Sequence, residues 1–146
     1  NSSNLNTILI DRGFSAGIKE HSPVLSSRGV VGKVIVSSEK TSVVQLISDG
    51  SFRLSVKIMP SEAEGILRWK NDTICEIFEV QKTSDISIGD PVITSNLSTY
   101  FPPNLPVGEV VSMHEKSDSF NKVIRIKLYS DLSKLNQLFI ISEGDN

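Results

Sequence analysis

The chain is dominated by short segments in which apolar and polar residues alternate with a period of two. The clearest example is Phe52–Ile58, which reads FRLSVKI. This alternation is typical of a strand with one buried face, so the apolar residues at 52, 54, 56 and 58 should enter a core. Further strand-like segments lie at residues 7–11, 30–36, 65–69, 74–80, 91–94, 107–113, 123–129 and 138–141. The pattern predicts an all-β fold.

Two stretches of the chain, residues 17–49 and residues 89–131, repeat one order of motifs. In each, a glycine is followed by a Pro-Val pair that opens a strand, a Val-Gly pair within a second strand, and a Ser-Asp pair after a third. The glycines inside strands, Gly32 and Gly108, mark bulges or bends that allow a short sheet to curl. A repeated supersecondary unit indicates two similar lobes. We therefore expect an internal duplication that gives two small β-barrel lobes of the six-stranded type.

Polar interruptions suggest where these lobes divide. The segments at 60–65 and 81–85 are the two main ones. We expect residues 6–69 to form the first β-barrel lobe and residues 70–142 the second. The final strand, 138–141, could close either barrel, and residues 1–5 and 143–146 should be flexible ends.

Composition supports a globular β-protein and excludes several classes. The chain is 38% hydrophobic and 22% charged, with a formal net charge of −2. It holds two alanines, Ala16 and Ala63, although alanine is the best helix former. Basic residues are scattered, which is unlike the clustered footprint of a nucleic-acid-binding protein. No apolar run approaches the roughly 18–20 residues of a bilayer-spanning helix.

The residues that could carry chemistry are few. The single cysteine, Cys75, excludes an internal disulfide and sits in a strand pattern, where a free cysteine behaves as a small buried hydrophobe. His21 and His114 are the only candidate bases for a Ser-His-carboxylate mechanism, and both are expected in exposed turns. We predict no catalytic residue, no metal ligand and no cofactor. Two alternatives stay open: an inactive or cryptic chymotrypsin-like double-barrel hydrolase, and an OB-like nucleic-acid-binding barrel.

The motifs also occur in a recognisable order. The segments IDRG, GIKEHSPVL, GVVGKV, VVQLISD and IGDPVITSNLSTYFPPNLPVGEVV follow one another along the chain. Together they resemble the extracytoplasmic domain of the rod shape-determining MreC family, over roughly residues 6–142. Asn96 and Asn104 stand where that family usually has glycine. Asparagine is the commonest other residue at positive φ, so both positions should form left-handed turns.

The resemblance implies a non-catalytic scaffold of the cell-elongation (rod) complex that maintains cell shape. Such a domain would lie on the periplasmic side of the bacterial inner membrane, held by a single-pass N-terminal anchor that this sequence lacks. It would self-associate into a homodimer or filament. It would also bind the elongation penicillin-binding transpeptidase and the membrane proteins MreD and MreB, and so organise peptidoglycan synthesis.

The best candidate for a partner-binding surface is the loop at residues 96–106. It is the larger insertion of the second repeat and carries two aromatic residues at its tip. Aromatic residues in exposed loops are common interface anchors. The predicted partner-binding residues are Asn96, Tyr100, Phe101, Pro102 and Asn104. The alternative is that Phe101 plugs the end of its own barrel, and the sequence leaves both possibilities open.

Overall fold

The computed structural model describes residues 6–115 and 120–142, and these residues form an all-β protein. The expected flexible ends, 1–5 and 143–146, lie outside the described residues. The strands are β1 (Thr7–Ile10), β2 (Pro23–Leu25), β3 (Val30–Ser37), β4 (Ser42–Leu46), β5 (Leu54–Ile58), β6 (Ala63–Asn71), β7 (Ile74–Gln81), β8 (Pro91–Thr94), β9 (Pro106–Glu115), β10 (Asn121–Leu128) and β11 (Phe139–Ile140), and one 3-10 turn, η2, spans Phe14–Ala16. The all-β prediction is confirmed. In the described part of the chain no helix is long and apolar enough to cross a membrane.

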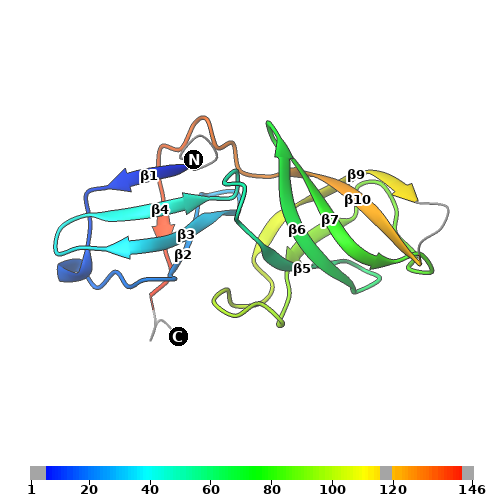
Figure 1. The fold of residues 1–146 in the computed structure, drawn as a ribbon, viewed down its shortest axis with the longest axis horizontal. Helices are drawn as coiled ribbons and strands as arrows, with labels where there is room; N and C mark the ends of the chain where they lie inside the picture. Colours follow the sequence, from blue (N-terminus) through cyan, green and yellow to red (C-terminus); the bar gives the residue numbers. More distant parts are fainter. Residues whose placement is uncertain (1–5, 116–119, 143–146) are drawn as a thin grey trace.

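The strands form two units that lie end to end (Figure 1). The second unit is a closed six-stranded barrel with the order β10-β7-β6-β5-β8-β9. The first unit is a five-stranded antiparallel sheet with the order β1-β4-β3-β2-β11. Among the described residues no pairing joins β1 to β11. One lobe is therefore closed by hydrogen bonds and the other is open along one side.

The duplication is visible in the strand pairing of the two lobes. The meander β2-β3-β4 matches the meander β8-β9-β10. Val24 lies opposite Gly32 and Val92 lies opposite Gly108, and in both lobes the register shifts immediately after this pair. A Cβ atom at either glycine would overlap a carbonyl oxygen of the neighbouring strand. Both glycines are thus required by close strand approach beside a bulge, as the sequence predicted.

Hydrogen bonds refine the alignment of the two repeats. The backbone N–H of His21 donates to the Val34 carbonyl at 2.7 Å, and that of Gly89 donates to the Val110 carbonyl at 2.8 Å. His21 has a φ of 71° and Gly89 a φ of 94°. The residue equivalent to Gly89 is therefore His21, whereas the motif order had paired Gly89 with Gly17. A histidine occupies a left-handed position that is glycine in the other copy.

The strand pairing also departs from the expected division at residue 69. Strands β5 and β6 pair with each other and with β8 and β7 inside the closed barrel. The polar segment at 60–65, which suggested a nearby boundary, is the hairpin turn between them. The division between the sheets lies before β5, at a turn where Ile47 and Asp49 are buried. Strand β11 pairs with β2, so the final strand belongs to the first unit.

Each unit has its own apolar core, and the two cores meet. The alternating segment Phe52–Ile58 contributes four side chains with 2% exposure or less to the barrel core, as predicted. Val30, the first residue of β3, and Ile47, which directly follows β4, belong to the same cluster. Leu132 packs against both cores. The hydroxyl groups of Ser26 and Ser130 lie 2.7 Å apart across this boundary. The lobes therefore share a packed junction.

Candidate protein-binding site

The loop between β8 and β9, residues 95–105, is here called the junction loop because it extends from the barrel toward the first sheet (Figure 1). Its two ends are held by a buried Thr-Ser pair. The hydroxyl of Thr94 donates to the Pro102 carbonyl at 2.6 Å and accepts from the Leu105 N–H at 2.9 Å. The hydroxyl of Ser95 accepts from the Leu97 N–H at 3.1 Å. Because both hydroxyl-bearing residues are fully buried, these bonds fix the shape of the loop.

The five predicted partner-binding residues point in different directions. Phe101 is 5% exposed and packs edge-to-face against Phe52, with ring centroids 6.2 Å apart. It therefore lies in the barrel core, which is the alternative that the sequence left open. Asn96, Pro102 and Asn104 are exposed. Asn104 has the predicted positive φ, 73°, but Asn96 is not among the described residues with positive φ, so that prediction was wrong.

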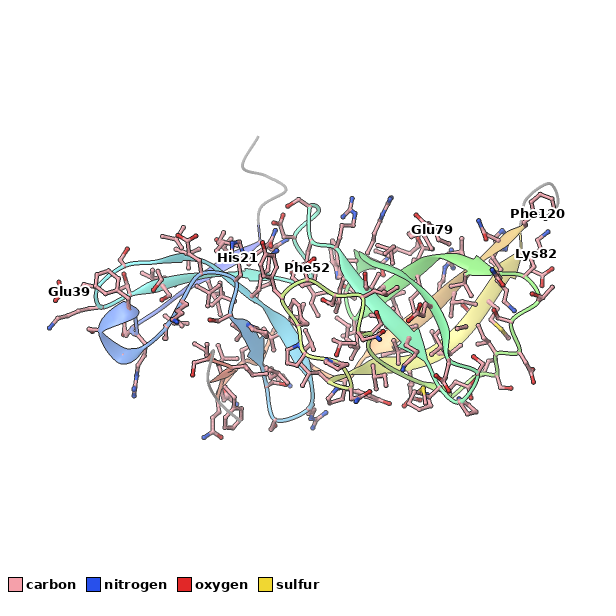
Figure 2. The ribbon with its side chains drawn as sticks, turned by 90° about the horizontal axis from the view of Figure 1, so that it is seen from below. His21, Glu39, Phe52, Glu79, Lys82 and Phe120 are labelled. Carbon is pink, nitrogen blue, oxygen red and sulfur yellow. The ribbon has the colours of Figure 1, made fainter. Side chains whose placement is uncertain are left out.

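Tyr100 joins the two lobes. Its ring stacks on the imidazole of His21, with centroids 4.1 Å apart and planes 8° from parallel. The ammonium group of Lys33 lies 5.2 Å from the centroid of the same ring. In Figure 2, both His21 and Phe52 are labelled in the part of the molecule where the first sheet meets the barrel. Both histidines are exposed, as predicted, but no pattern in the sequence indicates a stack between residues 79 positions apart (100 − 21).

A groove runs over the outer face of β5 and β6 beneath the junction loop. It consists of two adjoining hollows of about 240 Å³ and about 160 Å³, and both are lined by Ser55, Ile66 and Leu97. Ser55 and Ile66 are directly opposite each other in the β5-β6 ladder. Leu97 is 65% exposed and Tyr100 46% exposed, so the groove has large apolar groups open to solvent at its rim.

Charged residues mark the two ends of this groove. Lys33 and Arg53 line the hollow nearest the first sheet, and Glu64 and Glu79 line the other. We call this surface the junction groove. The residues that line it include Lys33, Arg53, Ser55, Glu64, Ile66, Glu79, Leu97 and Tyr100. An apolar middle between a basic end and an acidic end is suited to an extended polypeptide segment.

The side chains that could act as nucleophiles or bases, Cys75 and the two histidines, do not line the groove. Burial raises the pKa of the Cys75 thiol to about 12, so at neutral pH it is protonated and cannot act as a nucleophile. Within residues 6–115 and 120–142, no group of three histidine, cysteine or acidic side chains is arranged to hold a metal ion. His21 is stacked on Tyr100, and His114 lies near the far end of β9.

Comparison with known protein families shows to which family this chain belongs. Residues 1–142 match the family model described as the rod shape-determining protein MreC, barrel core. The chain belongs to the MreC family. The resemblance seen in the sequence motifs is thereby confirmed, and the family's proteins are named for their role in determining cell shape.

Individual relatives agree with this assignment. The cell shape-determining protein MreC of Escherichia coli K12 is 30% identical over 94% of this chain, which spans 38% of that protein. Across the first curated relatives that it matches, the chain spans between 38% and 53% of their length. A solved structure described as the major periplasmic domain of the cell shape-determining filament MreC superposes with a TM-score of 0.81 and 25% identity, covering 99% of this chain and 92% of that one.

A further solved relative is a complex between the penicillin-binding protein PBP2 and MreC from Helicobacter pylori. Its matching chain gives a TM-score of 0.70 at 21% identity, over 85% of this chain and 80% of that one. At this identity the match concerns the fold. The two-unit β-architecture of this chain is thus that of known MreC proteins.

Proposed function

We propose that this MreC-family domain is a non-catalytic scaffold that binds the elongation penicillin-binding transpeptidase and so helps to organise peptidoglycan synthesis. Its place would be the periplasmic side of the inner membrane, held by an N-terminal membrane anchor. Two relatives support the proposal. One MreC is solved in complex with a penicillin-binding protein, and another is described as a periplasmic domain of a filament.

The observation that carries the proposal is the junction groove. Stable interfaces need a buried apolar or aromatic anchor surrounded by a polar rim. Leu97 and Tyr100 are large, exposed and held on a loop that buried hydroxyl groups fix in shape. Because the loop is preorganised in this way, it loses little conformational entropy when a partner binds. Among the predicted residues, Tyr100 is the proposed anchor, with Asn96, Pro102 and Asn104 beside it, and Phe101 supports the loop from within.

The proposal also includes self-association into a dimer or filament, and membership of a larger assembly with MreD and MreB. These partners come from the family resemblance. The alternatives of a hydrolase and of a nucleic-acid-binding barrel have less support. The chain carries a net charge of −2, which does not suit nucleic-acid binding. His21, one of the two candidate bases of a hydrolase, is stacked on Tyr100. Incubation with a broad panel of fluorogenic peptides should release no product above the buffer rate.

The decisive experiment measures binding of this domain to the purified penicillin-binding transpeptidase of the same organism by biolayer interferometry. Leu97→Ala and Tyr100→Ala should each raise the Kd by about tenfold or more, the equivalent of about 1.4 kcal/mol. Ile88→Ala is the matched control, because Ile88 is 69% exposed but does not line the groove. Absence of binding by the unmodified domain would refute the function. Equal losses for all three variants would refute the site.

A further inference from the structure

Strand β1 is an edge strand whose outer side carries unpaired backbone groups. Within the described residues it pairs with β4 alone. The Leu46 N–H donates to the Asn6 carbonyl at 2.9 Å across this ladder. Because antiparallel ladders alternate, the N–H and C=O groups of Ile8 and Ile10 also point toward β4, and those of Thr7 and Leu9 point away from it. The outer side of β1 is therefore ready to pair with another strand.

Natural edge strands usually carry features that prevent such pairing, and β1, although only four residues long, lacks three of them. Charged side chains, proline and β-bulges are the common protective features. The four residues of β1 read Thr-Ile-Leu-Ile, and their register with β4 is unbroken. In Figure 1, β1 lies along the outer border of the first sheet. Its register is regular, and the side chains of Thr7 and Leu9 are exposed.

In the second lobe, the position equivalent to the one beside β1 is occupied by a strand. Strand β4 of the first repeat is equivalent to β10 of the second, and the strand next to β10 is β7, just as β1 is next to β4. On its other side β7 pairs antiparallel with β6, which closes the barrel. The first lobe has no equivalent of β6 among the described residues. The open position beside β1 is thus a strand position that the other copy of the fold fills, in antiparallel orientation.

An exposed apolar row leads to the same edge. Leu9 lies opposite Val43 on β4, and Val43 lies opposite Val36 on β3. Ile8 and Ile10 pack into the core, so this row is on the opposite, outer face. Leu9 is 67% exposed and Val36 46% exposed. The row ends at Leu9, where the sheet stops.

We propose that β1 pairs antiparallel with β1 of a second copy of this chain, about a two-fold axis at Leu9. Leu9 then lies opposite Leu9 of the second copy, and the apolar row continues unbroken from one sheet into the other. Thr7 lies opposite Asp11 of the second copy, so no like charges face each other. The orientation is the one that β6 has toward β7. This inference rests on the self-association included in the proposed function and gives that association its surface.

Site-directed cross-linking tests this geometry directly. Residues directly opposite in a hydrogen-bonded antiparallel pair have Cα atoms about 5.5 Å apart, which is within disulfide range. A Leu9→Cys variant should therefore form a covalent dimer under mild oxidation. The native Cys75 is fully buried and does not interfere. Val36→Cys is the matched control, because five strand spacings would hold its two copies roughly 24 Å apart and prevent a cross-link.

Sedimentation velocity supplies a second, independent measurement. Leu9→Lys places two like charges on the proposed axis and should weaken self-association by about tenfold or more. Ile88→Lys is its control, since Ile88 is 69% exposed, belongs to neither β1 nor the junction groove, and precedes strand β8 of the barrel. Both substitutions are on the surface and should leave the melting temperature nearly unchanged.

Each outcome supports the inference or overturns it. Cross-linking at residue 9 alone, with weaker association for Leu9→Lys only, supports it. A monomeric unmodified chain overturns self-association together with this inference, while transpeptidase binding is judged by its own experiment. If the chain dimerises and Leu9→Lys does not weaken the dimer, or if Val36→Cys cross-links, then pairing through β1 is wrong while self-association stands. If Leu9→Lys instead weakens transpeptidase binding and leaves the dimer intact, the edge receives a strand from another protein and the second-copy assignment is wrong.

Discussion

Replacing Phe101 by alanine should lower the free energy of unfolding by about 3–5 kcal/mol, although the residue belongs to a surface loop. Its ring is 5% exposed and packs edge-to-face on Phe52. Removing a buried aromatic side chain loses about 2–3 kcal/mol of transfer free energy. The edge-to-face pair adds about 0.5–1.5 kcal/mol, and the cavity left behind adds a further cost. The sum lies in the range typical of buried Phe→Ala substitutions, about 3–5 kcal/mol.

Urea unfolding followed by fluorescence measures this change. Trp69 is the only tryptophan of the chain and lies on β6, so its emission reports the barrel. A loss of this size is a large share of the roughly 5–15 kcal/mol that stabilises a typical domain, and it should lower the Tm by about 10 °C. Tyr100→Ala is the control. Its ring is 46% exposed and loses mainly the His21 stack, so it should cost about 1 kcal/mol or less. If Phe101→Ala costs less than Tyr100→Ala, the loop is not anchored through Phe101 and the reasoning is refuted.

Three further predictions concern the barrel and the turn that follows its last strand, β10. Gly108→Ala should destabilise the domain by about 1–3 kcal/mol in urea titrations, because the added Cβ would overlap the Lys127 carbonyl oxygen; a neutral result would contradict the close approach of the strands. Cys75 should not react with a thiol reagent at pH 8 until denaturant unfolds the barrel, since burial raises its pKa to about 12; rapid labelling of the native domain would argue against this burial. The hydroxyl and backbone N–H of Ser133 lower the pKa of the Asp131 carboxyl, so Ser133→Ala should raise that pKa toward its ordinary value in an NMR titration. Any stability from this bond is present above the unfolded pKa of Asp131 and is lost as the pH falls through its lowered folded pKa. If Ser133→Ala leaves the Asp131 titration unchanged, the bond from the Ser133 hydroxyl is absent.

Local periodicity was sufficient to predict the strands because each strand has one face in a core. The segment Phe52–Ile58 alternates in sequence and in burial alike. The two Val-Gly pairs also predicted bulges correctly, because a glycine within a strand usually marks a bulge or a close approach of two backbones. These features depend on neighbours along the chain or one strand away, which the sequence itself displays.

The division between the lobes could not be read in the same way. A polar turn looks alike whether it joins two lobes or two strands of one hairpin, and the turn at 60–65 is a hairpin turn. The actual transition contains a buried Asp49, whose carboxylate accepts hydrogen bonds from Gln45 at 2.5 Å and Ser51 at 3.1 Å. The segment 48–51, Ser-Asp-Gly-Ser, is itself polar, so its composition does not distinguish this turn between lobes from the turn within the hairpin.

The candidate site was predictable as a loop but not as a set of contacts. The aromatic pair at its tip identified the right segment, yet Phe101 turns into the barrel and Tyr100 turns toward the first sheet. The two residues lie in a bend of the loop and face different neighbours, so the local sequence does not show which of them is buried. Which of them is buried depends on Phe52 and His21, which are distant in sequence and belong to different units.

The order of strands along the chain explains why one lobe is closed and the other open. Strands β5, β6 and β7 lie between the two repeats, and all three join the second repeat to complete its barrel. In the part of the chain that the structure describes, the first repeat has only β1 and the two-residue β11 to extend its sheet, and these lie on either side of it in the sequence, before β2 and after β10. The closed lobe therefore presents side chains over its outer face, and the open lobe presents backbone at an edge. Recognition of a different protein suits the first kind of surface, and pairing with an identical strand suits the second. Substitutions in the junction groove should for this reason affect transpeptidase binding without affecting self-association, and substitutions on β1 should do the reverse.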